Sequence, residues 1–318
     1  MTGRGEFDPR IAISGTEFRD EPIDTLLRTA DEVGVAAIEL WYPENLRADA
    51  GGVALARLAA WPGQVAAVSA GVEIGETSDV PGSRSRLIEA LELADRLGAP
   101  VVNTYFGAPG YRDDRRSGEV LARNLEPVLR RAESLGVTVV LENEFDAFGR
   151  DRYGGDLTRR PHALREAVRR IGSARLRLNF DAANFYCAGV EPFPYAYEVL
   201  ADDVEYLHVK DIRRADPAVP AQDGPSVRYH DYDRAYVTTA LGSGAVNWPG
   251  LLARLAADRY PGPLTLEPHV RPEHRTAALA QAAGWLRAEV AGLRGRPADP
   301  SPPVPPLSAP QSILMGGH

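Results

Sequence analysis

Short apolar runs alternate with longer amphipathic stretches along most of this sequence, and this alternation restricts the fold more than any other feature. Eight runs have the length and apolar content of β-strands: Arg10–Ser14, Ala36–Trp41, Gln64–Ile74, Pro100–Phe106, Val137–Glu144, Arg175–Asp181, Val204–Asp211 and Pro263–Glu267. Helical patterns follow them at Pro22–Val33, Val53–Trp61, Ser85–Leu97, Gly118–Leu135, Pro161–Ile171, Pro194–Leu200, Trp248–Ala257 and Thr276–Leu293. Eight strands that are each followed by a helix predict a closed parallel (β/α)8 barrel, an α/β fold of the TIM-barrel type.

An open, doubly wound parallel sheet is the alternative fold for this order of elements. Such a sheet usually carries a glycine-rich phosphate-binding turn after its first strand, and the segment Ile13–Phe18 lacks one. The dense Val and Leu content of Val137–Glu144 is typical of a parallel strand buried on both faces. We therefore favour the barrel, in which helices ending at Gly34, Gly98 and Gly136 are expected to have left-handed C-caps.

The composition predicts a globular, cytoplasmic protein. Of its 318 residues 44% are hydrophobic, which is enough for a packed core. A net charge of −8 without a basic segment argues against a nucleic acid partner, and no apolar run approaches the ~20 residues of a membrane span. The first residues lack the apolar stretch of a signal peptide, and the single cysteine, Cys187, cannot form an internal disulfide and suggests a reducing compartment.

Two inserts and the C-terminal end depart from the regular pattern. The barrel is expected to occupy residues 1–293, and the Pro-rich residues 294–318 are expected to form a disordered, flexible tail. Residues 145–160 and 212–246 are longer than a barrel loop requires. Both follow the carboxyl end of a predicted strand, which is the edge where the active sites of such barrels lie.

Polar side chains close several of the predicted strands. Early strands end at or near Glu39, Glu73 and Asn103, and four successive later strands end at or near Glu142, Asp181, His208 and Glu267. Three carboxylates from the later strands would repel one another at the barrel mouth unless a cation lay between them. With one imidazole they form an oxygen-rich ligand set, so we expect these four residues to bind one divalent metal ion.

The segments around these four residues resemble a known family. LENE, NFDAANF, YLHVKD and the pair LGSGAVNWPGLL and PLTLEP are similar to motifs of the sugar phosphate isomerase/epimerase family, whose members are xylose isomerase-like TIM barrels. The resemblance extends from about residue 10 to residue 290. It implies that Glu142, Asp181, His208 and Glu267 bind Mn²⁺ in the first place, with Mg²⁺, Co²⁺ or Zn²⁺ as alternatives. It also implies that Glu142 and Glu267 are the catalytic acid/base pair.

The reaction implied by the resemblance is the isomerisation or epimerisation of a keto-sugar, a cyclitol or a related polyol. In such enzymes a divalent ion chelates the carbonyl and a neighbouring hydroxyl, which acidifies the adjacent C–H and stabilises the enediolate. Carboxylates on opposite sides of that carbon can then remove and return the proton. The expected partner is a small carbohydrate-like molecule, and a homo-oligomer or a partner subunit is also compatible with the sequence.

Lys210 is the only lysine among the 36 Lys and Arg residues, and it lies on the same strand face as His208. A partly desolvated amine can lose its proton, whereas a guanidinium cannot, so we interpret Lys210 as a catalytic group. Arg214 follows His208 by six residues and resembles an arginine that contacts substrate oxygens in related ketose epimerases. Arg213 is an equal candidate for that contact.

Five further residues are expected to contact the substrate. Asn184 and Glu144 stand where many ketose epimerases have histidine, which argues against a simple free ketose. An amide at Asn184 can donate to a hydroxyl but cannot act as an acid near neutral pH. His269, just beyond the eighth strand, can supply an imidazole from another direction, and Asn103 and Tyr105 close the fourth strand, where Tyr105 can stack on a sugar ring.

Three other functions compete with this interpretation. A lyase on the same scaffold, either a dehydratase or an enzyme that cleaves 3-oxo-C-glycosides by β-elimination, would share the first step and then expel a leaving group. A phosphodiesterase similar to endonuclease IV would need histidines from the early strands for additional zinc ions, and the first histidine is His162. A barrel that only binds a ligand or a protein would have no need of an intact metal-binding set.

Overall fold

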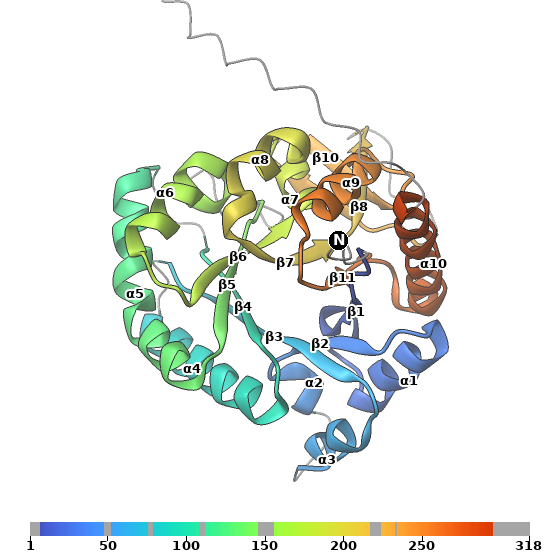
Figure 1. Cartoon of the computed structure of the whole chain (residues 1–318), viewed down its shortest axis with the longest axis horizontal. Helices are drawn as coiled ribbons and strands as arrows, with labels where there is room; N and C mark the ends of the chain where they lie inside the picture. The colour runs from blue at the N-terminus through green and yellow to red at the C-terminus, as the bar shows by residue number, and fades with distance from the viewer. Residues whose placement is uncertain are drawn as a thin grey trace, which may run out of the picture.

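Eight parallel strands close into a barrel surrounded by helices in the computed structural model of this chain (Figure 1). The structure describes residues 7–47, 52–75, 79–107, 112–145, 156–216, 224–232 and 234–294. The barrel strands are β1 (Ile11–Ser14), β2 (Ala37–Trp41), β3 (Gln64–Glu73), β4 (Val101–Tyr105), β5 (Thr138–Glu142), β6 (Leu176–Asp181), β7 (Val204–Val209) and β11 (Leu264–Leu266). The predicted barrel is confirmed, and the open doubly wound sheet is excluded.

The strand register brings the predicted metal ligands to one edge of the barrel. Around the barrel the strands follow the order β1-β11-β7-β6-β5-β4-β3-β2, and neighbours pair in parallel. Asp181 is the Cα partner of His208, and Glu142 is the Cα partner of Asn179. Because all the strands run in one direction, polar residues at their carboxyl ends gather at a common mouth.

Helices cover the outside of the barrel (Figure 1). The α-helices are α1 (Ile23–Val33), α2 (Glu44–Arg47), α3 (Val53–Ala60), α4 (Val80–Leu97), α5 (Asp114–Leu135), α6 (Pro161–Ile171), α7 (Ala182–Cys187), α8 (Tyr197–Leu200), α9 (Trp248–Asp258) and α10 (Arg275–Arg294). Shorter turns are η1 (Gly15–Phe18), η3 (Leu157–Arg159), η4 (Pro192–Ala196), η5 (Ala201–Asp203) and η6 (Pro272–His274). The predicted left-handed caps at Gly34, Gly98 and Gly136 are confirmed, because these residues end α1, α4 and α5 with φ of 67–73°.

Two helices begin earlier than the hydrophobic pattern predicts. Helix α4 begins at Val80 rather than Ser85, because the Asp79 side chain caps it and accepts the N–H of Gly82 at 2.9 Å. Helix α5 likewise begins before its predicted start and is capped by Asp113. In both helices a polar cap adds a turn whose residues carry no apolar periodicity.

The core has one layer outside the barrel and another inside it. Val139 and Leu141 of β5 pack in the large cluster beneath the surrounding helices. Val140 points the other way and packs inside the barrel with Ala67, Val101 and Tyr206. Since side chains alternate along a strand, Glu142 follows Val140 and faces the interior at the barrel mouth.

The second long insert, predicted at residues 212–246, contains an additional antiparallel sheet. It contains β8 (Asp211–Ala215), β9 (Arg228–Asp231) and β10 (Arg234–Thr239), in the order β8-β10-β9. The predicted strand Val204–Asp211 is therefore wrong at its end, because β7 stops at Val209 and Asp211 opens a different sheet. The Asp211 carboxylate accepts backbone N–H groups from Gly242 and Gly244 at 3.0 and 2.9 Å, which anchors this sheet beside the barrel.

Parts of the predicted inserts and of the predicted C-terminal tail lie outside the described residues. These segments include residues 146–155 of the first insert and residues 295–318 of the predicted tail. The predicted boundary between residues 293 and 294 falls at the last residue of α10, which ends at Arg294. Among the described residues, no helix combines the length and the hydropathy needed to cross a membrane.

Candidate metal centre

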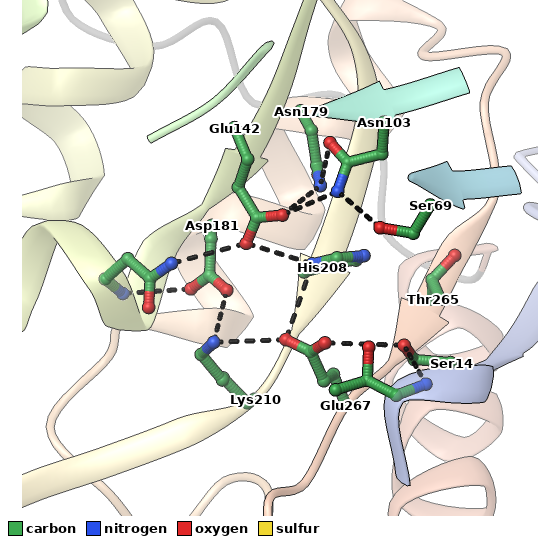
Figure 2. A network of polar contacts seen from close by, with 12 residues as sticks. Ser14, Ser69, Asn103, Glu142, Asn179, Asp181, His208, Lys210, Thr265 and Glu267 are labelled. Carbon is green, nitrogen blue, oxygen red and sulfur yellow. Dashed lines mark hydrogen bonds and ion pairs between the residues drawn. The ribbon is translucent and has the colours of Figure 1, made fainter. Parts of the chain in front are cut away.

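Side chains from four strand ends meet at the barrel mouth. Ligand atoms of Glu142, Asp181, His208 and Glu267 lie within 4.8 Å of one another, and all four residues are buried. Figure 2 shows these side chains pointing toward one another from separate strands. The structure thus brings together the four residues that the sequence predicts as metal ligands.

Three amides hold the carboxylate of Glu142 in place. Asn103 and Asn179 donate to Glu142 Oε2 at 2.8 and 3.0 Å. Asn184 donates to Glu142 Oε1 at 3.3 Å. Because these donors are neutral, they orient the carboxylate without cancelling its charge, which stays available to a cation.

Asp181 is fixed by contacts to the backbone and to a buried cation. Its Oδ1 accepts the N–H of Asn184 at 2.9 Å and caps α7, and its Oδ2 lies 2.7 Å from Lys210 Nζ. The side chain of Asn143 accepts the Asp181 N–H and donates to the Asp181 carbonyl, both at 2.8 Å. Burial raises the pKa of Asp181, although the charge of Lys210 opposes this rise.

Glu267 is surrounded by cationic donors and one hydroxyl. Its Oε2 lies 3.1 Å from Lys210 Nζ and 3.4 Å from His208 Nδ1, and its Oε1 accepts the Ser14 hydroxyl at 3.3 Å. Burial by itself would raise the pKa of Glu267, but the charges of His208, Lys210 and His269 hold this pKa well below its usual range. Glu267 is therefore ionised at neutral pH.

Both ring nitrogens of His208 face carboxylates. Nδ1 lies 3.1 Å from Glu142 Oε1, and Nε2 lies 2.9 Å from Glu39 Oε2. Burial would lower the pKa of His208, but Glu142, Glu267 and Glu39 raise it well above its usual value. The metal-free ring is therefore an imidazolium that donates from both nitrogens.

Lys210 is an ammonium in the metal-free chain, which differs from the expected readily deprotonated amine. Burial would lower its pKa, as the sequence argument assumes, but Asp181, Glu267 and Glu142 raise the pKa well above its usual value. The sequence shows the lone lysine but not the two carboxylates that the fold brings into contact with it. Such contacts favour the charged form of an amine and here outweigh desolvation.

The buried ionisable side chains at the barrel mouth suit a divalent cation. We call them the buried charged cluster, which comprises Glu39, Glu142, Asp181, His208, Lys210 and Glu267. Its four carboxylates outnumber its two basic side chains, so negative charge remains in excess even with both bases protonated. Three carboxylates and an imidazole are ligands that suit Mn²⁺, Mg²⁺, Co²⁺ and Zn²⁺, the ions expected from the sequence.

A family model described as xylose isomerase-like TIM barrel matches residues 27–289. The chain belongs to this xylose isomerase-like TIM barrel family. The matched residues contain the whole set of predicted metal ligands, in agreement with the resemblance of the strand-end motifs. None of the curated proteins matches the sequence of the chain significantly.

Solved structures of xylose isomerase-like barrels superpose on most of the chain. The probable 3-DHS dehydratase AsbF from Bacillus anthracis has 15% identity and a TM-score of 0.68 over 87% of this chain and 98% of its own. An L-ribulose 3-epimerase has 17% identity and a TM-score of 0.65 over 90% and 96% of the two chains. The IOLI protein with a bound zinc atom has 16% identity and a TM-score of 0.66 over 89% and 99%. At such identities the likeness establishes the common fold alone.

In this xylose isomerase-like barrel, His269 joins the cluster to the additional sheet. Its Nε2 lies 3.0 Å from Glu267 Oε2, and its Nδ1 lies 2.9 Å from the hydroxyl of Tyr229 in β9. Its backbone N–H donates to Glu17 Oε1 at 2.6 Å, and its φ of 47° is uncommon for a residue other than glycine. The structure therefore brings His269, a predicted substrate-binding residue, into direct contact with the cluster.

Three other predicted substrate-binding residues of the xylose isomerase-like barrel lie beside Glu142. Asn103 donates to Glu142, and its amide also approaches the Tyr105 hydroxyl at 3.4 Å. The ring of Tyr105 lies 6.2 Å from that of Trp41, measured between centroids. Glu144 is half-buried, and burial followed by the charge of Glu142 raises the pKa of Glu144 well above its usual value.

Arg214 is not brought to the cluster. Arg214 and the alternative Arg213 are both exposed in β8. Within the residues that the structure describes, neither side chain contacts a predicted metal ligand. Because the chain leaves the barrel between β7 and β8, both arginines lie outside the barrel strands, and their contact with a substrate stays a prediction.

Several residues that complete the site were not predicted from the sequence. Asn179 precedes Asp181 by two residues and so shares its strand face, a signal that the sequence contains. Glu39 is apparent in the sequence only as a polar residue near a strand end, and its contact with His208 crosses the barrel. Tyr229 comes from a hairpin in the second insert, and the residues around it give no local sign of a role.

Proposed function

We propose that this chain is a divalent-metal-dependent enzyme that isomerises or epimerises a small carbohydrate-like substrate, such as a keto-sugar, a cyclitol or a related polyol. The observation that carries the proposal is the convergence of four buried ligand side chains within 4.8 Å at the barrel mouth. Family membership supports it, as does the fold shared with an L-ribulose 3-epimerase.

The residues that would hold the ion are Glu142, Asp181, His208 and Glu267. When bound, a divalent ion polarises the substrate carbonyl and stabilises negative charge on its oxygen. Mn²⁺ is our first choice, with Mg²⁺, Co²⁺ and Zn²⁺ as alternatives. The zinc atom of the IOLI structure supports a divalent metal on this fold.

Glu267 is the residue that we assign to proton abstraction. The charges of His208, Lys210 and His269 lower its pKa and keep the carboxylate ionised, so an oxygen lone pair is free to take a proton from the carbon next to the carbonyl. The electron pair of that C–H bond then moves toward the carbonyl oxygen. Lys210 Nζ and His269 Nε2, at 3.1 and 3.0 Å, keep the Glu267 carboxylate oriented during this transfer.

The product depends on where the proton returns. A proton that Glu267 returns to the former carbonyl carbon, while the proton of the adjacent hydroxyl moves to the former carbonyl oxygen, gives an isomer. A proton that Glu142 delivers to the opposite face of the original carbon gives an epimer. In both cases substrate and product contain the same atoms. Asn103 and Asn184 offer amide donors for substrate hydroxyls, and Tyr105 offers an aromatic face beside them.

A lyase is the second candidate, and the asymmetry of the two glutamates favours it. Both glutamates contact His208, but the other donors to Glu142 are three neutral amides, whereas Glu267 also contacts the protonatable side chains of Lys210 and His269. In a β-elimination Glu267 would take the α-proton, the C–H electrons would form a C=C bond and the bond to the β-substituent would break. Lys210 or His269 would then protonate the departing oxygen of water or an alcohol. The fold shared with a probable 3-DHS dehydratase also supports this candidate.

Solvent deuterium exchange followed by NMR tests the proposed function. Mn²⁺-loaded protein in D₂O is incubated with a panel of ketoses, inososes and 3-oxo-glycosides. We expect deuterium to enter next to the carbonyl of at least one substrate class, and Glu267→Gln to slow the exchange by about 10²–10⁴-fold. EDTA-treated protein should be inactive.

Thr265→Val is the matched control for this experiment. Thr265 is buried in the same barrel interior, but its hydroxyl bonds to the Tyr206 hydroxyl at 2.7 Å, not to a predicted ligand. The control should exchange at a rate close to that of the unmodified chain. Loss of water or of an aglycone would favour the lyase, and a lack of metal-dependent exchange across the panel would contradict the proposed function.

A further inference from the structure

Glu39 makes an ion pair with a predicted metal ligand, although its strand does not border that ligand's strand. It lies in β2, whereas His208 lies in β7, and β1 and β11 separate the two strands around the barrel. The contact joins Glu39 Oε2 to His208 Nε2 at 2.9 Å, and both side chains are fully buried. The carboxylate of Glu39 thus lies inside the barrel and contacts the imidazole of His208 on the side opposite Nδ1.

This placement of Glu39 is costly. Its second oxygen, Oε1, is buried and has no hydrogen-bond partner among the described residues. A buried carboxylate with an unpartnered oxygen loses hydration that the protein does not replace. Packing alone would be served better by an apolar residue, so the position calls for an explanation beyond filling the barrel.

Local backbone features hold Glu39 at this position. The pairing of β2 with β3 shifts register between Ile38 and Glu39, an irregularity that changes the direction of a side chain. Asn45 bridges the end of β2 to the turn after β1, since it accepts the Trp41 N–H at 2.7 Å and donates to the Gly15 carbonyl at 3.1 Å. Glu39 therefore lies in a strand whose end is held by the hydrogen bonds of Asn45.

The contact determines which imidazole nitrogen faces the predicted metal site. With Nε2 directed at Glu39, Nδ1 lies 3.1 Å from Glu142 Oε1 and 3.4 Å from Glu267 Oε2, two of the predicted ligands. A carboxylate that accepts a hydrogen bond from one nitrogen of an imidazole leaves the lone pair of the other nitrogen for a metal and fixes the plane of the ring. Nδ1 is therefore the nitrogen that would bind the ion.

We propose that Glu39 is a positioning residue that fixes the ring of His208 so that Nδ1, with its lone pair, is presented to the divalent ion. This inference rests on the proposed metal-dependent function, because it deepens the description of the same site. Glu39 itself would not touch the ion or the substrate. Its effect would pass through the Nε2–H hydrogen bond, and so it depends on both the reach and the charge of its carboxylate.

Three substitutions separate these two properties. Glu39→Gln keeps the reach and an acceptor oxygen but loses the charge. Glu39→Asp keeps the charge but shortens the side chain by one methylene group. Glu39→Leu removes the acceptor altogether. Thr265→Val is the control, because Thr265 is buried on the strand beside His208 and its hydroxyl bonds to Tyr206, not to a predicted ligand. Thermal unfolding in EDTA establishes that each variant is folded.

Two measurements that do not depend on turnover test the proposal. The first is Zn²⁺ affinity, measured by competition with a chromophoric chelator. We expect Glu39→Leu to weaken Zn²⁺ binding by about 10–100-fold, Glu39→Asp to weaken it clearly, and Glu39→Gln to weaken it less than tenfold. Thr265→Val should stay within about twofold of the unmodified chain.

The second measurement is the ¹⁵N NMR spectrum of the histidine ring in the zinc-loaded protein, with His208→Asn used to assign the signals. The unmodified chain should show a protonated Nε2 and a metal-bound Nδ1 at His208, and Glu39→Gln should keep this pattern. The proposal is overturned if Glu39→Leu, or Glu39→Asp where the leucine variant does not fold, keeps both the ring pattern and the Zn²⁺ affinity.

These outcomes separate the proposal from the proposed function. If the unmodified chain binds Zn²⁺ and the Glu39 variants bind it equally well, only the role of Glu39 is wrong. If the unmodified chain binds no divalent ion, both the role of Glu39 and the metal-dependent function are wrong. If affinity and ring pattern change as expected but no substrate exchanges deuterium, the role of Glu39 stands and the substrate class is wrong.

Discussion

The Nζ atom of Lys210 lies 2.7 Å from Asp181 Oδ2, and it lies between this oxygen and Glu267 Oε2 at 3.1 Å (Figure 2). The ammonium thus contacts two of the four predicted metal ligands. In the metal-free chain it supplies part of the positive charge that the buried carboxylates require. A divalent ion at the same place would compete with it for these oxygens, which makes Lys210 a counter-charge as well as a candidate catalytic group.

Replacement of Lys210 should therefore affect the metal-free protein most strongly. Lys210→Met leaves Asp181 and Glu267 without their shared ammonium, and the loss of one partner from a buried ion pair costs about 3–5 kcal/mol in the free energy of unfolding. Thermal unfolding in EDTA should show this loss, and Mn²⁺ should restore much of it. Mn²⁺ should also bind the variant more tightly than the unmodified chain.

Lys210→Arg is the matched variant, because it keeps the positive charge. It should remain closer to the unmodified chain in EDTA but lose deuterium-exchange activity, since a guanidinium has a different shape and does not orient Glu267 as the ammonium does. Equal destabilisation of Lys210→Met with and without Mn²⁺ would contradict a role as counter-charge.

Metal binding should release protons, and it should tighten as the pH rises. Glu39, Glu142 and Glu267 raise the pKa of His208, so the protonated ring stabilises the metal-free fold at pH values below its ordinary pKa of about 6.5. That stability is lost as the pH rises through the raised pKa. A metal ligand must give up its proton, so protons and the ion compete for His208.

Titration calorimetry with Mn²⁺ in buffers of different protonation enthalpy measures the protons released. The observed heat should vary with the buffer at neutral pH, and the dissociation constant should fall as the pH rises. A heat that is independent of the buffer, together with an affinity that does not change with pH, would show that His208 carries no displaceable proton.

The additional sheet should contribute to stability through one buried ion pair. The two terminal nitrogens of Arg159, Nη1 and Nη2, donate to Asp231 in β9 at 2.7 and 3.0 Å, and both residues are buried. Asp231→Asn should lower the free energy of unfolding by about 3–5 kcal/mol, because it removes the charge of a buried carboxylate that Arg159 and Arg234 both contact. It should also weaken substrate binding, since β9 carries Tyr229 to His269.

Glu126→Gln provides the comparison for this prediction. Glu126 pairs with Arg130 on the exposed face of α5, and such pairs contribute about 1 kcal/mol or less. Denaturant unfolding of both variants gives the contrast directly. If the two substitutions had equal and small effects, the link from Arg159 to the sheet would not contribute to stability.

Much of the site could be predicted from the sequence because local rules determine it. The barrel follows from eight repeated strand and helix patterns. The side chains of Glu142, Asp181, His208 and Glu267 follow from their positions at strand ends, since parallel strands bring those ends to one mouth. The position of Asn179 could have been predicted too, because side chains alternate along a strand and Asn179 precedes Asp181 by two residues.

The remaining features depend on contacts between segments far apart in the sequence. The pairing of Glu39 with His208 crosses the barrel, so no spacing in the sequence encodes it. The charged state of Lys210 in the metal-free chain depends on two carboxylates from other strands, and the lone lysine in the sequence does not reveal these contacts. Arg214 was assigned by its resemblance to an arginine of related ketose epimerases. It lies exposed in β8, beyond the end of β7, and its contact with a substrate stays a prediction.

Anomalous X-ray diffraction from crystals soaked in Mn²⁺ tests the central claim most directly. We expect one strong manganese peak within coordination distance of carboxylate oxygens from Glu142, Asp181 and Glu267 and of His208 Nδ1, and no peak in crystals of His208→Asn. A manganese peak held by other residues, or none in the unmodified chain at saturating Mn²⁺, would contradict the claim that these four side chains form the metal centre.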